Sequence, residues 1–132
     1  MKNQLICLSF VSMFLITSCS RDNNNNDNVE AGTWRVTLFT DSGNDETSDF
    51  SGYTFTFGDG GVLTAAKSGS SKTGTWSKSS NDFNIDLGTK TDSNKPLGEL
   101  TDNWDIISVT DNEIKLQDDN PSSGEFLTFQ KN

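Results

Sequence analysis

The sequence contains no histidine, and its 132 residues include only two cysteines. Histidine is the commonest general base near neutral pH and the commonest neutral metal ligand. Without it, and with few thiols, the serine and cysteine triads lack their parts. Carboxylate pairs like those of glycosidases are not favoured either, because the acids fall mostly in predicted turns and on outward strand faces. We therefore predict a protein that is not an enzyme and has no cofactor and no metal site.

Basic residues are scarce as well. Ten lysines and arginines stand against 19 aspartates and glutamates, which gives a formal net charge of −9. Such a charge argues against binding nucleic acid and against lying flat on anionic lipid. It suits a solvated protein surface.

The chain has no apolar run of transmembrane length. Leu5–Ile16 is an apolar stretch of about twelve residues behind the positive Lys2, and a membrane-spanning helix needs about 20. This pattern predicts a secretory signal peptide over residues 1–18. The alternative is a buried strand or helix of the folded domain, but the stretch shows no amphipathic pattern.

The two cysteines, Cys7 and Cys19, lie within the predicted signal and directly after it. Cleavage before Cys19 would leave one cysteine and exclude an intrachain disulfide. Ile16-Thr17-Ser18-Cys19 resembles the lipobox of bacterial lipoproteins, which implies that Cys19 is acylated, with palmitate among the chains, and becomes the new N-terminus. An ordinary signal peptide with an unmodified cysteine is the alternative.

The implied anchor decides where the protein works. Each buried methylene contributes about 0.8 kcal/mol, so two or three acyl chains hold a protein on a membrane almost permanently. Ser20 follows the cysteine; by resemblance to sorting rules of some Gram-negative bacteria this favours the outer membrane of the cell envelope. Whether the domain faces the periplasm or the exterior stays open.

Residues 19–31 begin with the acylated cysteine and continue into an asparagine-rich segment without apolar side chains up to Asn28. Such a segment cannot bury enough surface to fold, and we predict a disordered tether. Fully extended, residues 20–31 would reach about 40 Å.

From Gly32 onward the apolar residues recur with a period of two, which is typical of half-buried strands. In the first strand Trp34 and Leu38 are expected to face inward and Phe39 outward; Phe126 also falls on an outward phase. Ile106 and Ile107 are neighbours and would face opposite ways unless a bulge intervenes, so the phase of this strand stays ambiguous. No segment has a helical period. Eight strands are predicted, around residues 33–39, 53–57, 62–65, 73–78, 83–87, 104–109, 114–116 and 127–129.

Eight short strands joined in sequence predict an all-β domain at residues 32–132, an eight-stranded antiparallel up-and-down barrel. A barrel of this size is either filled by its own side chains or wide enough for one small ligand. The many large apolar residues favour a mostly filled interior. We expect a monomer, although nothing in the sequence fixes the oligomeric state.

Gly32-Thr33-Trp34 resembles the Gly-x-Trp signature of lipocalins, and Thr110-Asp111-Asn112 lies where lipocalins carry a Thr-Asp motif. The segment 53–61 and the echo Gly74-Thr75-Trp76 extend the resemblance to the small lipocalin-like domains of bacterial envelope lipoproteins. In lipocalins the signature tryptophan closes one barrel end under an arginine from the last strand. Here no such arginine exists, and Lys131 could take its place, although it lacks the planar group.

This resemblance implies non-catalytic binding of a small apolar or amphipathic ligand. The aromatic residues that would line the ligand site are Trp34, Tyr53, Phe55, Trp76 and Trp104. Core packing is the competing interpretation of these side chains. The alternative function is an envelope interaction module with a filled barrel, which would contact a protein or a glycan through its loops and outer aromatic residues.

One acidic loop, Asp41–Asp49, offers oxygen ligands of the kind that calcium prefers. Its spacing does not match the twelve-residue calcium loop, so a solvated loop is favoured. Asp118-Asp119-Asn120 is a weaker candidate of the same kind.

Overall fold

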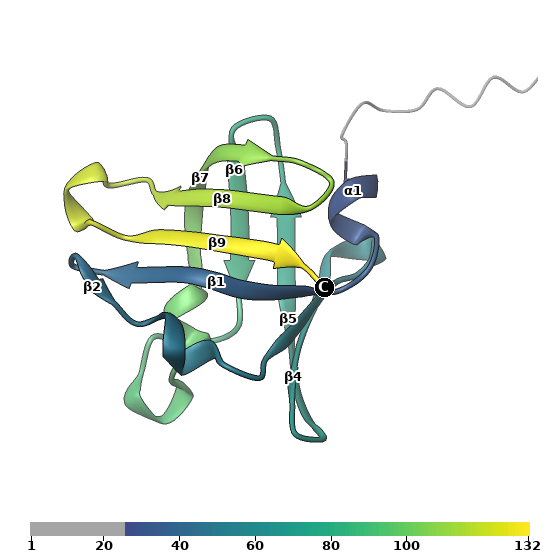
Figure 1. Cartoon of the computed structure of the whole chain (residues 1–132), viewed down its shortest axis with the longest axis horizontal. Coiled ribbons are helices and arrows are strands. Elements are labelled where there is room, and N and C mark those ends of the chain that lie inside the picture. Colours follow the sequence, from purple (N-terminus) through teal and green to yellow (C-terminus); the bar gives the residue numbers. More distant parts are fainter. Residues whose placement is uncertain (1–25) are drawn as a thin grey trace, which may run out of the picture.

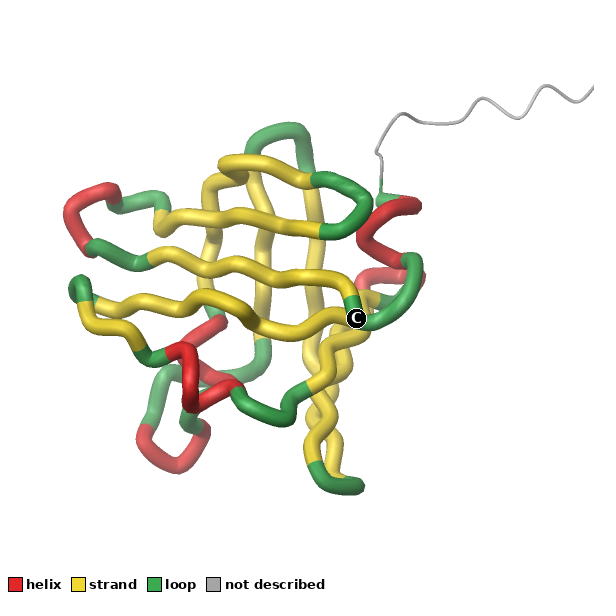
Figure 2. Tube along the Cα trace, viewed as in Figure 1, coloured by secondary structure: helices red, strands yellow, loops and turns green. Residues whose placement is uncertain are grey.

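The computed structural model describes residues 26–132, which form one antiparallel sheet of nine strands that curls on itself. β1 pairs with β2 and with β3, and from β3 onward each strand pairs with the next. β1 also pairs with β9, which closes the sheet into a barrel (Figures 1 and 2). The predicted all-β barrel of eight antiparallel strands is confirmed, with one extra two-residue strand, β2. The predicted signal peptide, Cys19 and tether residues 19–25 lie outside the described residues.

The strand bounds agree with the predicted segments to within a few residues. They are β1 (Trp34–Asp41), β2 (Asn44–Asp45), β3 (Thr54–Phe57), β4 (Val62–Lys67), β5 (Ser70–Lys78), β6 (Asp82–Asp86), β7 (Asp102–Val109), β8 (Glu113–Asp118) and β9 (Phe126–Lys131).

Helical structure in residues 26–132 is limited to single turns. These are α1 (Asp27–Glu30) and the 3₁₀ turns η1 (Thr47–Phe50), η2 (Asp59–Gly61), η3 (Asp92–Asn94), η4 (Leu97–Leu100) and η5 (Pro121–Ser123). Among these residues, no helix has the length and apolar character needed to cross a membrane.

The predicted phase of the first strand was wrong beyond Val36. A bulge lies between Val36 and Leu38 in the pairing of β1 with β9. The extra residue moves the following side chains to the opposite face. Phe39 is therefore fully buried, and its ring packs 5.1 Å from that of Phe50, whereas Leu38 is 37 % exposed.

The sequence left the phase of β7 open, and the structure resolves it. The register of β7 with β8 shifts between Ile106 and Ser108, so Ile106 packs against the core while Ile107 is 50 % exposed. Phe126 faces outward, as the alternation in β9 predicted.

The predicted boundary between tether and domain was placed too late. Asp27–Glu30 forms the turn α1, and the side chain of Val29 is fully buried in the core. The folded part therefore includes residues that were assigned to the tether. The buried Val29 side chain docks this segment on the barrel, together with hydrogen bonds that the Val29 and Asn28 carbonyls accept from Trp34 and Lys131.

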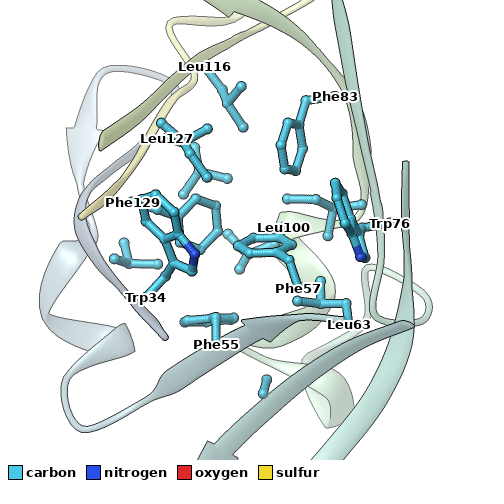
Figure 3. Close-up of a cluster of buried hydrophobic side chains, with 14 of the residues drawn as sticks. Trp34, Phe55, Phe57, Leu63, Trp76, Phe83, Leu100, Leu116, Leu127 and Phe129 are labelled. Carbon is cyan, nitrogen blue, oxygen red and sulfur yellow. The ribbon is translucent and has the colours of Figure 1, made fainter. Parts of the chain in front are cut away.

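The barrel interior is filled by aromatic rings that meet around Phe57. Its ring makes edge-to-face contacts with Trp34, Trp76, Phe83 and Phe129 at centroid distances of 5.3–6.4 Å. Figure 3 shows these side chains reaching inward from opposite walls of the barrel. Edge-to-face pairs are favourable beyond their buried area. Between these walls the interior holds protein side chains.

The register defines two ends of the barrel. At the closed end lie Trp34, η2, the β5–β6 and β7–β8 turns and the end of β9. At the loop-covered end lie the tip of the β4–β5 hairpin, the start of β7, η5 and the connection 88–101 with η3 and η4. The hairpin tip and η3–η4 project beyond the rest of the sheet in Figure 1.

Candidate functional site

The five aromatic residues predicted to line a ligand site do not share one surface. Trp34, Phe55 and Trp104 are fully buried in the core, and Trp76 is 5 % exposed. Tyr53 is partly exposed and packs on the edge of the same core. Their role in ligand binding stays a prediction, and among the five Tyr53 is best placed to meet a molecule from solvent.

The closed end is sealed around Trp34. Its indole Nε1 donates a hydrogen bond to the Val29 carbonyl at 2.9 Å. Lys131 Nζ lies 4.8 Å from the centre of the tryptophan ring and donates to the Asn28 carbonyl at 3.1 Å. Lys131 thus occupies the place proposed for it, with a cation over the aromatic face. This end of the barrel is closed by tightly packed side chains.

The loop-covered end is built differently, because a long connection folds back over it. Leu97 and Leu100 of η4 are buried, and the Leu100 carbonyl accepts the indole N–H of Trp104 at 3.0 Å. Thr101 Oγ1 accepts from the Leu87 amide at 2.9 Å and donates to the Gly88 carbonyl at 2.7 Å. These bonds satisfy backbone groups that the end of β6 leaves unpaired.

Beside this connection lies a pocket of about 380 Å³, which we call the mouth pocket. The inner face of the β4–β5 hairpin forms one wall, and Tyr53, beside β4, and Leu97 contribute apolar surface. Its lining residues are Tyr53, Ala65, Lys67, Ser68, Ser70, Ser71, Lys72 and Leu97. Because Ala65 and Leu97 belong to the core, the pocket ends on the filled interior.

Two lysines stand on the walls of the mouth pocket. Lys67 Nζ lies 4.9 Å from the centre of the Tyr53 ring. Lys72 Nζ donates to Asn94 Oδ1 in the connection. In the part of the chain that the structure describes, neither lysine forms an ion pair, whereas Lys90, Lys95 and Lys115 do.

A larger hollow of about 510 Å³ lies on the outer surface of β5, β6 and the start of β7. Its walls include the exposed side chains of Thr75, Ser77 and Asn84, which alternate with core residues along the strands. A polar outer sheet face is the ordinary consequence of such alternation. The smaller mouth pocket is the better candidate because it combines apolar surface with a few polar groups.

Three carboxylates also converge at the loop-covered end, and we call them the carboxylate cluster. Asp102 begins β7, Asp118 ends β8 and Glu125 precedes β9, with oxygens within 4.8 Å of one another. Lys90 Nζ lies 2.5 Å from Asp102 Oδ2. The cluster therefore already contains a cation supplied by the protein itself.

The protonation of the cluster follows from its burial. Burial raises the pKa of Glu125 to about 7, and a hydrogen bond with Asp118 adds to this. Burial also raises the pKa of Asp118, but hydrogen bonds from Ser123 and Glu125 outweigh it and leave this pKa below its ordinary value. Below about pH 7, Glu125 thus mostly holds a proton that it donates toward the Asp118 carboxylate.

The predicted acidic loop 41–49 does not form a comparable group. Asp45 accepts a hydrogen bond from the Thr47 amide at 2.9 Å, and Asp41 accepts from Ser42 at 2.9 Å. Within residues 26–132, the carboxylates that converge come from other segments. Sequence reasoning named Asp118, as part of Asp118-Asp119-Asn120, but missed Asp102 and Glu125, because strand pairing brings these three residues together.

The architecture defines a class of protein: a small closed antiparallel barrel with one sealed end and one loop-covered end. Comparison with solved structures shows the same fold in two Bacteroides proteins. A DUF4847 family protein from Bacteroides vulgatus superposes with a TM-score of 0.59 at 17% identity, over 81% of this chain and 96% of that one.

A protein from Bacteroides eggerthii superposes with a TM-score of 0.57 at 17% identity, over 78% of this chain and 99% of that one. No protein-family model and no curated protein matches the sequence. At this level of identity the structural likeness establishes the fold alone.

Proposed function

We propose that the protein is a lipid-anchored lipoprotein of the cell envelope, held at the outer membrane through acyl chains on Cys19. Its barrel binds a small apolar or amphipathic molecule without catalysis. The support for the anchor is the apolar stretch Leu5–Ile16 followed by Ile16-Thr17-Ser18-Cys19. The support for binding is the mouth pocket, which is the observation that carries this part of the proposal.

The anchor is tested by replacing its attachment point. Cys19→Ala removes the thiol that would be acylated, and we expect the protein to leave the membrane fraction because its acyl chains are lost. Cell fractionation followed by immunoblotting measures this, with Cys7→Ala as the matched control that keeps the anchor. A Cys19→Ala protein that stays as firmly membrane-bound as the wild type would contradict the proposal.

The filled interior limits what the pocket can hold. Phe55, Phe57 and Leu63 occupy the barrel axis with no exposed surface. A ligand therefore lies at the loop-covered end, against Tyr53, Ala65 and Leu97, and does not run along the axis. A volume of about 380 Å³ is in the range of small-molecule pockets.

Native mass spectrometry of the full-length protein, released from its own membranes in mild detergent, tests this binding. We expect an additional small molecule on the wild type and none on Ser70→Trp, because the indole would fill the mouth pocket from an exposed position. Ser77→Trp, in the outer hollow, is the matched control and retains the molecule. The absence of any bound molecule, or equal binding by Ser70→Trp, would count against the proposal.

A second candidate function, contact with another envelope protein or a glycan, is favoured by one observation. Leu38 and Phe126 are both well exposed, and the β1–β9 register makes them diagonal neighbours on the outer face. If this candidate is right, the wild type carries no bound small molecule but can be crosslinked to its envelope partner in intact cells. The Leu38→Ser, Phe126→Ser double variant is expected to lose these crosslinks.

A further inference from the structure

The two lysines of the mouth pocket narrow the chemistry of its ligand. We infer that the mouth pocket binds a small organic acid whose anionic group lies at Lys67 and Lys72 and whose apolar part lies on Tyr53, Ala65 and Leu97. This inference rests on the proposed binding function and specifies the class of ligand.

The hairpin register places both cations on one face. Lys67 pairs with Ser70, and Ala65 pairs with Lys72. Side chains of paired and alternate residues point to the same side of a sheet, so Lys67 and Lys72 are diagonal neighbours beside Ala65. Diagonal neighbours are about 7–8 Å apart at Cα, within reach of one carboxylate for two long side chains.

The charge of these lysines is not balanced locally. The chain carries 19 acidic residues against 10 basic ones, yet the ion pairs found in residues 26–132 involve Lys90, Lys95 and Lys115 and leave Lys67 and Lys72 aside. Lys67 lies over the Tyr53 ring and Lys72 donates to a neutral amide. Both ammonium groups keep N–H donors for an oxyanion, since each has three.

The rest of the lining fits a short apolar body. Ala65 is 1 % exposed and Leu97 is 7 % exposed, so the pocket floor is apolar and closed. Ser68, Ser70 and Ser71 of the hairpin complete the lining, and Ser70 shares the face of Lys67 and Lys72. An acid with one ring or a short chain satisfies both parts of this surface, because its apolar body covers the floor and its head group stays at the lysines.

The test compares probes that share one body and differ in the head group. Full-length protein in nanodiscs of neutral lipid is titrated calorimetrically with phenylbutyrate, phenylbutanamide and phenylbutylamine, and heats from empty nanodiscs are subtracted. We expect the acid to bind about tenfold more tightly than the amide, the size of a charge-assisted hydrogen bond, and the amine to bind least.

Variants separate the charge from the pocket itself. Lys67→Gln with Lys72→Gln is expected to bring the acid down to the affinity of the amide. Lys78→Gln with Lys115→Gln removes the same charge elsewhere and is expected to preserve the difference. Lys67→Arg with Lys72→Arg keeps both positive charges and is expected to keep the preference for the acid over the amide. This variant shows whether a loss in the glutamine variant comes from the missing charge or from a disturbed hairpin. Circular dichroism melting confirms that each variant is folded.

The outcomes distinguish the inference from the function on which it rests. Equal binding of acid and amide, both lost in Ser70→Trp, would overturn the acid preference and leave small-molecule binding intact. An acid preference that survives the double glutamine change would also overturn it. If none of the three probes binds, both the inference and binding at the mouth pocket are contradicted.

Discussion

The two ends of the barrel are closed by different kinds of contact. At the closed end, Trp34 is covered by Val29 and by the cation of Lys131, and its indole N–H is satisfied by a backbone carbonyl. At the loop-covered end, the connection 88–101 is held by hydrogen bonds and by the ion pair of Lys90 with Asp102. Apolar packing contributes at both ends, since Leu97 and Leu100 are also buried, but the additional polar contacts at the loop-covered end leave a pocket and a titratable cluster there.

This difference indicates which end of a filled barrel can bind a ligand. Aromatic packing at the closed end leaves no surface for a ligand, because the rings meet each other. Polar contacts at the loop-covered end require side chains that reach solvent, and these side chains create a chemically distinct pocket wall. We expect mutations at the closed end to change stability and mutations at the loop-covered end to change binding and pH response.

The largest expected effect comes from the closed end. Trp34→Ala removes a fully buried side chain, and large-to-small changes of this kind cost about 3–5 kcal/mol of unfolding free energy. Urea denaturation followed by circular dichroism measures this cost. Under conditions where the variant is folded, probe affinity at the mouth pocket is expected to stay unchanged. A strong loss of probe affinity in the folded variant would contradict the proposal that the two ends act separately.

A smaller effect, with a definite sign, comes from Glu125. Its pKa is raised to about 7 in the folded protein, above the ordinary 4.5. Between these values the native state binds a proton that the unfolded state has lost, so stability from this group falls as pH rises from about 4.5 to 7. Above that range, ionised Glu125 faces the Asp118 carboxylate.

Glu125→Gln is therefore expected to be more stable than the wild type at pH 8 and similar to it at pH 4, because glutamine has no proton to lose and can still donate to Asp118. Melting temperatures at the two pH values measure the difference. Glu113→Gln, at the closed end, is the control. An unchanged pH dependence in Glu125→Gln would show that the carboxylate cluster does not couple to stability.

The strands and their closure could be predicted from the sequence because alternation of apolar residues is a local signal. Phe83, Ile85 and Leu87 alternate with polar residues and are all buried, as expected. Phe39 could not be placed in the same way, since the bulge after Val36 depends on pairing with β9 at the other end of the chain. The phase around Ile106 and Ile107 stayed ambiguous in the sequence, because the register shift there depends on the pairing of β7 with β8.

The candidate site was less accessible to sequence reasoning. Asp102, Asp118 and Glu125 converge only through the pairing of β7 with β8 and of β8 with β9. The mouth pocket was missed because Lys67 and Lys72 lie outside the predicted strands 62–65 and 73–78. In the structure the hairpin is longer, and Ala65, Lys67 and Lys72 share one of its faces. The turn between them, with Ser68 and Gly69 both at positive φ, fixes the register that brings the lysines together.

The most direct test of the account is a chemical-shift map of the full-length protein in nanodiscs, titrated with phenylbutyrate. Changes are expected at the amides of Tyr53, Ala65 and Lys72, and no change is expected at the indole N–H of Trp34. Changes centred on Trp34 and Phe57 inside the barrel, or on Ser77 and Asn84 in the outer hollow, would contradict it.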